Sequence, residues 1–166
     1  DMVALRIWLE PNRIITSRRR RLKTMESIRL QIEDKKGPHD LNDFFMRIID
    51  GISDRISDLI EELDADIDVI ENDITSGDES IKHSRDSLTA LRRQSAMLRR
   101  YIAPQRDALE RLHRESNSVL SATCRLELRE ESDRFRRYVE DLDLAREKIL
   151  VSQDQILTML TEEQNK

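Results

Sequence analysis

The sequence predicts a mainly α-helical protein, with three long helices that follow a short N-terminal β-hairpin and one shorter helix. Leu and Ile recur at helical spacing through most of the 166 residues, and only 3 Gly and 3 Pro are present, so few tight turns are available. Charged residues make up 38% and aromatic residues 4%. That balance is also typical of disordered chains, but the regular apolar spacing favours long helices and disfavours an all-β sandwich or barrel.

The N-terminal residues have the pattern of a hairpin. Residues 3–9 alternate between apolar and mixed positions, Pro11-Asn12 suits a turn, and residues 13–17 are rich in β-branched side chains. Two strands alone are marginally stable. We therefore expect this hairpin to be the edge of a larger sheet, with a preceding part of its domain missing from the chain.

Two helices are expected next. The first covers about residues 22–35, with Leu22, Met25, Ile28 and Ile32 on one face, and Gly37-Pro38 ends it. The second covers about residues 41–76. Its predicted apolar positions follow an eleven-residue repeat of 3.67 residues per turn, which predicts a nearly straight helix or slight right-handed coiling. These positions are Phe45, Ile48, Ile52, Ile56, Leu59, Leu63, Ile67, Ile70 and Ile74.

The remaining chain predicts two more long helices. Residues 79–114 carry a strict heptad, interrupted by Pro104, which removes one backbone hydrogen bond and predicts a kink. Residues 116–123 are expected to form a connection, and a last helix is predicted over about residues 126–161.

The net charge of −5 conceals a strong segregation along the chain. Residues 41–80 have a net charge of −11, and residues 81–115 have a net charge of +5. We expect these two helices to lie against each other, with Arg92 near Glu62 and Arg99 near Asp54. A solvated acidic face is an equally weighted alternative, since exposed ion pairs contribute only about 0–1 kcal/mol each.

Several classes of protein are disfavoured. No apolar run approaches the ~18 residues of a membrane span, and there is no signal-peptide pattern. Cys124 is the only cysteine, which leaves no intrachain disulfide and no Cys-x-x-Cys site. We find no catalytic motif and expect neither an enzyme nor a bound cofactor. The pI near 5.4 and the lone basic run at 18–21 indicate no nucleic-acid partner.

Five segments carry a resemblance to a known family. They are residues 5–8 (LRIW), 13–22 (RIITSRRRRL), 37–38 (GP), 91–106 (LRRQSAMLRRYIAPQR) and 137–143 (RYVEDLD). In this order they resemble the cytoplasmic region of the CorA family of divalent-cation transporters, and most of all its zinc-transporting, ZntB-like branch.

The resemblance implies a homopentameric protein of the cell inner membrane, of which this chain is a soluble fragment on the cytoplasmic face. It divides the chain into the C-terminal remnant of an α/β domain (1–37), an antiparallel long-helix hairpin (38–125) and a stalk helix (126–166) that leads toward an absent first transmembrane helix. The loop that contains Gly-Met-Asn between the family's two membrane spans is not in this sequence, which leaves zinc or magnesium preference open.

One acidic turn is a candidate metal site. Glu71, Asp73, Asp78 and Glu79 surround Gly77, and carboxylate oxygens suit hard divalent cations. A solubilising, helix-capping turn is the favoured alternative.

The side chains suited to zinc are spread along the chain. They are His39, His83, His113 and Cys124, and none stands at i, i+4 spacing from another. We therefore expect surface roles for the histidines rather than a zinc site.

The function that this sequence predicts is pentamer assembly, a cation vestibule and gating, in a CorA/ZntB-like transporter of zinc or magnesium ions. The alternative is a soluble coiled-coil adaptor or scaffold that binds partner helices, because rod length and heptads fit that class equally well.

Overall fold

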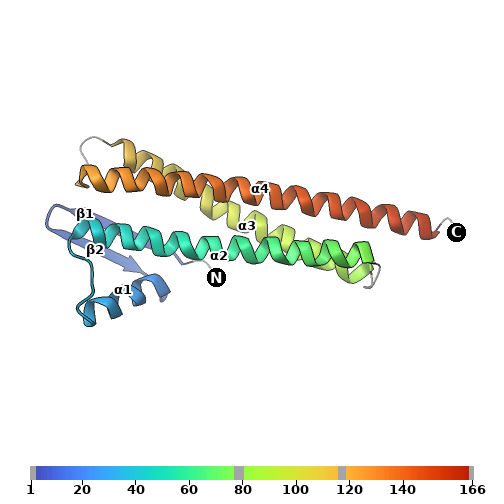
Figure 1. Ribbon diagram of the computed structural model, residues 1–166, viewed down its shortest axis with the longest axis horizontal. Helices are drawn as coiled ribbons and strands as arrows, with labels where there is room; N and C mark the ends of the chain where they lie inside the picture. The colour runs from blue at the N-terminus through green and yellow to red at the C-terminus, as the bar shows by residue number, and fades with distance from the viewer. Residues whose placement is uncertain (1–2, 77–80, 116–118, 165–166) are drawn as a thin grey trace. The chain divides into compact units, whose positions relative to one another are not determined.

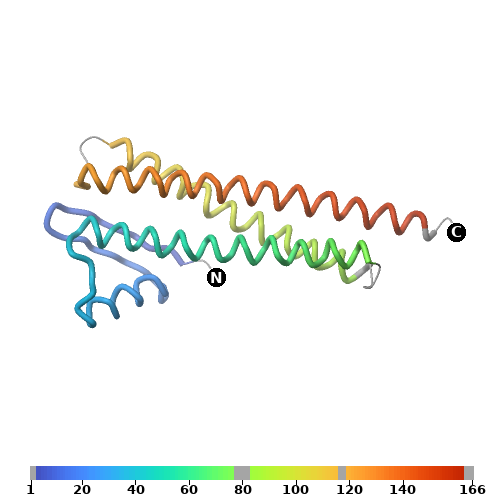
Figure 2. Tube along the Cα trace, in the orientation of Figure 1, coloured from blue at the N-terminus to red at the C-terminus, as the bar shows by residue number. Residues whose placement is uncertain are grey.

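The computed structural model describes residues 3–76, 81–115 and 119–164, and its elements confirm the predicted fold class (Figure 1; Figure 2). The elements, in chain order, are β1 (Leu5–Glu10), β2 (Arg13–Arg18), α1 (Lys23–Glu33), α2 (Leu41–Ser76), α3 (Ile81–Arg114) and α4 (Ala122–Gln164). The chain forms two compact units. Unit 1 comprises residues 1–55 and 106–134, and unit 2 comprises residues 56–105 and 135–166.

The strands β1 and β2 of unit 1 form the predicted antiparallel hairpin. Leu5 pairs with Arg18 and Glu10 with Arg13, so Trp8 and Ile15 stand directly opposite each other. Both of these large side chains are exposed. Directly opposed aromatic and β-branched residues stabilise a strand pair, and the Trp8 indole N–H also donates to Glu10 Oε1 at 3.0 Å.

The helix α1 ends earlier than the sequence predicted. Lys35 adopts a left-handed backbone conformation, with a φ of 59°. The Lys35 N–H donates to the Ile32 carbonyl at 3.1 Å and the Lys36 N–H to the Gln31 carbonyl at 2.8 Å. These two bonds form a Schellman motif. The stop therefore lies before Gly37-Pro38, and the expected core residue Ile32 is exposed.

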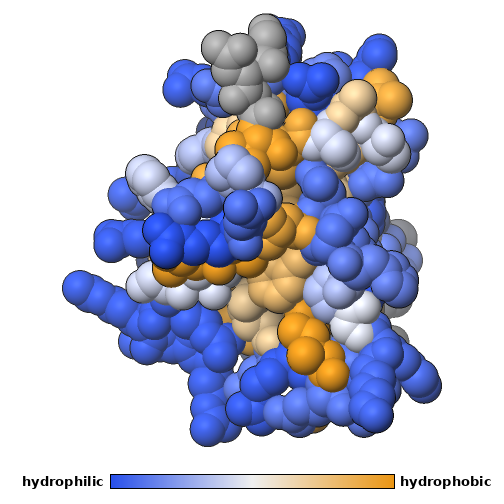
Figure 3. All heavy atoms as spheres, turned by 90° about the vertical axis from the view of Figure 1, so that its left-hand side faces the viewer, coloured by the Kyte–Doolittle hydropathy of each residue, from blue (hydrophilic) through white to orange (hydrophobic). Residues whose placement is uncertain are grey.

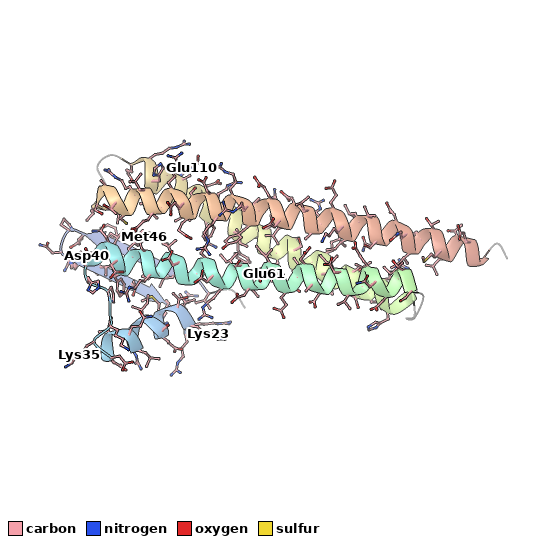
Figure 4. All side chains as sticks on the ribbon, in the orientation of Figure 1. Lys23, Lys35, Asp40, Met46, Glu61 and Glu110 are labelled. Atoms are coloured by element: carbon pink, nitrogen blue, oxygen red, sulfur yellow. The ribbon has the colours of Figure 1, made fainter. Side chains whose placement is uncertain are left out.

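The helix α2 begins with a reciprocal set of caps. The Asp43 N–H donates to Asp40 Oδ1 at 2.8 Å, and the His39 N–H donates to Asp43 Oδ2 at 2.8 Å. Asp40 is therefore the N-cap residue. Figure 4 labels Asp40 at the start of α2 and Lys35 at the end of α1.

Arg47 connects the start of α2 to the end of α1. Its guanidinium binds both carboxylate oxygens of Asp43, at 2.8 and 3.1 Å, and donates to Gln31 Oε1 at 2.9 Å and to the Lys36 carbonyl at 3.1 Å. The hydrogen bond from Arg47 holds the pKa of Asp43 below its usual value. This carboxylate therefore stabilises unit 1 above its unfolded pKa, and the contribution is lost as the pH falls through the folded value.

The buried face of α2 differs from the prediction. From residue 53 onward, the side chains turned inward follow steps of 3 and 4 throughout, which is a heptad rather than an eleven-residue repeat. Ser53 and Ile60 take core positions that had been assigned to their neighbours Ile52 and Leu59, and Leu59 is 38% exposed. The predicted eleven-residue repeat was therefore wrong for this face, and a 3.5-residue period predicts left-handed rather than right-handed winding.

The heptad of α3 is confirmed, and α4 follows the same period. Buried positions on α3 are Ser84, Leu88, Leu91, Ser95, Leu98, Ile102 and Leu109. Buried positions on α4 are Cys124, Leu128, Glu131, Ser132, Phe135, Tyr138, Val139, Leu142, Ala145, Ile149, Ser152 and Ile156. The helix α3 continues through Pro104.

The helix α4 begins four residues before its predicted start. Ser121 is its N-cap residue, because its hydroxyl oxygen accepts the Cys124 N–H at 3.1 Å and its carbonyl accepts the Arg125 N–H at 3.0 Å. The Ser121 N–H also donates to Asn42 Oδ1 at 3.0 Å. That contact ties the beginnings of α4 and α2 together in unit 1.

The surface of unit 1 combines charged and apolar areas. On the face seen in Figure 3, apolar side chains lie between hydrophilic ones. The large apolar side chains that unit 1 exposes include Trp8, Ile15, Leu30 and Ile32. Among the described residues, none of the helices combines the length and apolar character required to cross a membrane.

The contact between α1 and α2 yields a prediction. A Cβ on Gly51 would lie 2.5 Å from Thr24 Cγ2, and the Thr24 hydroxyl donates to the Gly51 carbonyl at 3.0 Å. We expect Gly51→Ala to destabilise the protein by about 1–2 kcal/mol through overpacking. Urea unfolding followed by circular dichroism measures this change.

The control removes the methyl group that causes the clash. In a Thr24→Ser background, which keeps the hydroxyl, Gly51→Ala should become neutral or stabilise by up to about 1 kcal/mol through helix propensity. A stabilising effect of Gly51→Ala in the wild-type background would contradict this account.

Candidate functional site: the acidic face of helix α2

Several acidic side chains of α2 bind side chains of α4. In unit 2, Lys148 Nζ lies 2.7 Å from Asp64 Oδ1 and 3.2 Å from Asp68 Oδ1. The hydrogen bond to Asp64 is the largest cause that raises the pKa of Lys148. One ammonium group therefore neutralises two carboxylates that stand a single helical turn apart.

In unit 1 the corresponding contact is made by Arg134. Its Nη2 atom lies 3.0 Å from Asp54 Oδ1, and its Nη1 atom lies 2.9 Å from Glu131 Oε1. Arg134 thus joins α2 to a carboxylate of its own helix.

The ion pairs predicted between α2 and α3 do not form; Arg99 and Asp54 have other partners. In unit 2, Arg99 Nε donates to Asp143 Oδ1 of α4 at 2.6 Å, and in unit 1 the partner of Asp54 is Arg134. The sequence prediction missed the contribution of α4. This helix carries both basic and acidic residues, and Arg134, Asp143 and Lys148 bind charged residues of α2 or α3.

Glu71, the first of the predicted metal ligands, is already engaged. Its Oε1 atom accepts a hydrogen bond from the Ser152 hydroxyl at 2.9 Å, and that hydroxyl also lies 2.9 Å from the Lys148 carbonyl. Asp73 is half-buried, and its carbonyl accepts from the Ser76 hydroxyl at 3.2 Å.

The other half of the predicted turn site, Asp78 and Glu79, lies outside the described residues. Within residues 3–76, 81–115 and 119–164, no group of three or more His, Cys, Asp or Glu side chains is placed to hold a metal ion. The four-carboxylate site therefore stays a prediction.

Among the described residues, the side chains suited to zinc belong to no group that could hold a metal ion. His113 Nδ1 lies 2.8 Å from the Arg125 carbonyl, which fixes the ring through a donated hydrogen bond. Cys124 is buried at the start of α4, and burial raises the pKa of its thiol to about 11. A thiol that stays protonated at neutral pH is a poor metal ligand. His83 is exposed on α3.

Glu131 is the notable residue that the sequence prediction left out. It is only 5% exposed, and among the described residues its Oε2 atom has no hydrogen-bond partner. The signal was present in the sequence, because residue 131 falls on the heptad between Leu128 and Phe135. The prediction used only the apolar residues of this pattern, so it left out a charged residue in a core position.

Comparison with known proteins places these features in a family. The family model described as "CorA-like Mg2+ transporter protein" matches residues 1–166. The chain belongs to the CorA-like family. This confirms the resemblance that the sequence segments had indicated.

Relatives and solved structures agree with this family. The chain is 30% identical over 166 residues to the zinc transport protein ZntB of Pectobacterium atrosepticum. The alignment covers 100% of this chain and 50% of that protein. The structure of full-length CmaX matches with a TM-score of 0.89 and 32% identity, covering 99% of this CorA-like chain and 50% of CmaX.

The cytoplasmic domain of ZntB from Vibrio parahaemolyticus shares the fold of this CorA-like chain. The TM-score is 0.83 at 18% identity, over 97% of this chain and 62% of that domain. The chain spans about half the length of the curated relatives it matches. These relatives are named as transporters, not as enzymes.

The contact between α2 and α4 in unit 2 yields a prediction. Lys148→Met should destabilise the CorA-like chain by about 1 kcal/mol at low ionic strength, since it leaves two carboxylates without their cation. The loss should shrink in about 1 M salt, which screens exposed charges. Urea unfolding at both salt concentrations measures the difference.

The matched control removes a positive charge from another face of α4. Arg146 is exposed, so Arg146→Met should change the stability by less than about 0.5 kcal/mol. Equal losses for the two variants would show that the recorded contacts of Lys148 carry no stability of their own.

Proposed function

We propose that this chain is the cytoplasmic part of a divalent-cation transporter of the zinc or magnesium type, located at the inner membrane. The observation that carries the proposal is the match of the CorA-like family model to all 166 residues. The transporter names of the relatives and the fold shared with a ZntB cytoplasmic domain support it. In this role the chain catalyses no reaction and holds no resident cofactor.

The proposed role of α2 is to attract cations electrostatically. Only Arg47 and Arg55 are basic among residues 41–80, against thirteen carboxylates. A surface of one charge sign raises the local concentration of opposite ions. The turn with Glu71, Asp73, Asp78 and Glu79 is the part of this surface that we propose binds the ion.

The outer face of α4 in unit 2 is the proposed contact between subunits of a homopentamer. Leu144 and Val151 stand seven residues apart, and each is 58% exposed. An open depression of about 560 Å³ lies on the same helix, lined by Glu140, Asp143, Leu144, Arg146, Glu147 and Leu150. Apolar residues at heptad spacing with charged flanks suit helix-to-helix association between copies.

The coiled-coil adaptor remains the second candidate, because exposed heptad positions would equally receive a partner helix. The two candidates differ in what the complete coding sequence contains. A transporter requires apolar segments of about 20 residues, whereas an adaptor requires none.

The transport proposal is tested with the product of the complete coding sequence that contains these residues, reconstituted into liposomes. We expect Zn²⁺ or Mg²⁺ to enter these liposomes faster than protein-free ones, as measured with a metal-sensitive dye. A complete product without membrane-spanning segments, or one without cation flux, would overturn the transport proposal in favour of the adaptor.

The acidic turn is tested in the same liposomes and by calorimetry. Glu71→Gln, Asp73→Asn, Asp78→Asn and Glu79→Gln together should weaken cation binding about tenfold, which corresponds to 1.4 kcal/mol. The matched control removes four carboxylates from the middle of α2, with the substitutions Asp58→Asn, Glu61→Gln, Glu62→Gln and Asp66→Asn. An equal loss in both variants would assign the effect to overall charge rather than to the turn.

The contact through α4 yields a separate prediction. Leu144→Glu with Val151→Glu should lower the oligomeric state of the full-length product in detergent, because charged side chains would have to be buried between copies. Native mass spectrometry measures the subunit number. Val69→Glu is the control, since Val69 is 57% exposed on α2. Pentamers in the α4 variant would place the contact elsewhere.

A further inference from the structure

The outer side of α3 in unit 2 carries a surface of arginine and apolar side chains. Arg93, Met97 and Arg100 follow one another at steps of four and three residues, so they lie on one side of the helix. Met97 is 47% exposed, its neighbour Tyr101 is 43% exposed, and both arginines are exposed. Every charged residue between 87 and 105 is an arginine. We call Arg93, Met97, Arg100 and Tyr101 the arginine face.

The outer side of α4 in unit 2 carries the opposite charge at the same spacing. Glu140, Leu144 and Glu147 also follow at steps of four and three residues, and we call them the glutamate face. Three carboxylates and one guanidinium give the open depression on this side a formal charge of −2. The depression is lined by the glutamate face together with Asp143, Arg146 and Leu150.

Both faces point away from the core of unit 2. Arg93 comes two residues after the buried Leu91 on α3, and Glu140 comes two residues after the buried Tyr138 on α4. Two residues correspond to about 200° around a helix, so each face lies opposite the buried stripe of its helix. Because the helices pack through their buried stripes, the two faces point to different sides of the unit and do not meet within one copy.

The charged side chains of the two faces are available to a partner. Among the described residues, the two arginines and the two glutamates form no ion pair and no side-chain hydrogen bond. The neighbouring charges Arg99 and Asp143 are already engaged with each other at 2.6 Å. The faces therefore hold charges that the folding of a single copy leaves uncompensated.

Two contacts fix the height of α3 against α4 in unit 2. The Ser95 hydroxyl donates to the Leu142 carbonyl at 3.2 Å, and Arg99 Nε donates to Asp143 Oδ1 at 2.6 Å. The two helices run antiparallel (Figure 1). A step toward the start of α3 therefore corresponds to an equal step toward the end of α4.

Counting from these contacts shows that the two faces match in height. To within one helical turn, each arginine of the arginine face is level with a glutamate of the glutamate face, and Met97 is level with Leu144. A contact between two different faces closes into a ring when its halves lie level along the symmetry axis, and otherwise produces a filament. Level faces therefore suit a ring whose axis runs along the helices.

We propose that the arginine face of one copy docks on the glutamate face of a second copy. This docking rests on the proposed homopentamer and supplies the other half of its α4 contact. Cyclic oligomers of more than two subunits require such a pair of different faces. Met97, Tyr101 and Leu144 form the apolar centre of the contact, and the arginine–glutamate pairs surround it, as in many protein interfaces.

A contact between two α4 helices fits these charges less well. It would place one glutamate face against another, and like charges in an interface are unfavourable. Docking on the arginine face places each carboxylate opposite a guanidinium, which can bind both of its oxygens.

Charge reversal in the full-length product tests the docking. Arg93→Glu with Arg100→Glu should lower the fraction of protein in pentamers about tenfold or more, because four carboxylates then face one another. Glu140→Arg with Glu147→Arg should have the same effect. All four substitutions together should restore the pentamer, since they exchange the two charges. Native mass spectrometry in detergent measures the subunit number.

Arg85→Glu with Arg92→Glu is the matched control. These two arginines are exposed, stand seven residues apart on α3 and lie outside the arginine face. The control makes the same change in net charge and should keep the pentamer. An equal loss of pentamers in the control would assign the effect to net charge and overturn the docking, as would a fourfold variant that stays dissociated.

Cysteine cross-linking identifies the helices that meet. Met97→Cys with Leu144→Cys in one chain should give disulfide-linked ladders of up to five copies under mild oxidation, because the two positions come within bridging distance only between copies. Neither substitution alone should give a ladder. A linked dimer from Leu144→Cys alone would show that two α4 helices meet, and the absence of a ladder from the double variant would also contradict the docking.

Cation flux separates this inference from the transport proposal. Charge-reversed variants that remain pentameric and carry normal flux into liposomes would overturn the docking of the two faces and leave the transporter intact. A wild-type product that is monomeric and carries no flux would overturn both.

Discussion

The constraint on which the rest of the structure depends is the seven-residue period that the three long helices share. A buried stripe that recurs every 3.5 residues meets an equal stripe on its neighbour over many turns, whereas a different period would drift off the contact within a few turns. This explains why α2 buries Ser53 and Ile60 more deeply than Ile52 and Leu59, the residues that the sequence analysis had assigned to the core. The common period decides which of two adjacent residues is used.

A common period also fixes the register of the charged contacts. Asp54 of α2 meets Arg134 of α4 in unit 1, and Asp68 meets Lys148 in unit 2. Both contacts join residues that are 80 positions apart in the chain, and the two contacts stand two heptads apart along each helix. The acidic residues of α2 therefore meet cations at equivalent heptad positions, although α4 as a whole has no basic character.

Sequence reasoning succeeded where the signal was local. The hairpin followed from alternation and a Pro-Asn turn, the bounds of α2 were confirmed, and the α3 heptad was unambiguous because each core position had one candidate. Sequence reasoning failed where two adjacent residues could each take a core position. It also failed where an ion pair depended on knowing which helix packs alongside. Net charge suggested that α3 would pair with α2, but ion pairs form between individual side chains, and Arg99 faces Asp143.

Polar residues also occupy heptad positions of the long helices. Ser95 donates to the Leu142 carbonyl at 3.2 Å, and Ser152 donates to Glu71 or to the Lys148 carbonyl. A serine can satisfy its hydroxyl on a neighbouring backbone, so it sits in a helix interface at little cost. A glutamate has two acceptor oxygens and no donor of its own while it is ionised. Arg134 binds one oxygen of Glu131 at 2.9 Å, and among the described residues the second oxygen has no hydrogen-bond partner. This makes position 131 of α4 chemically different from the buried serines of the same helix.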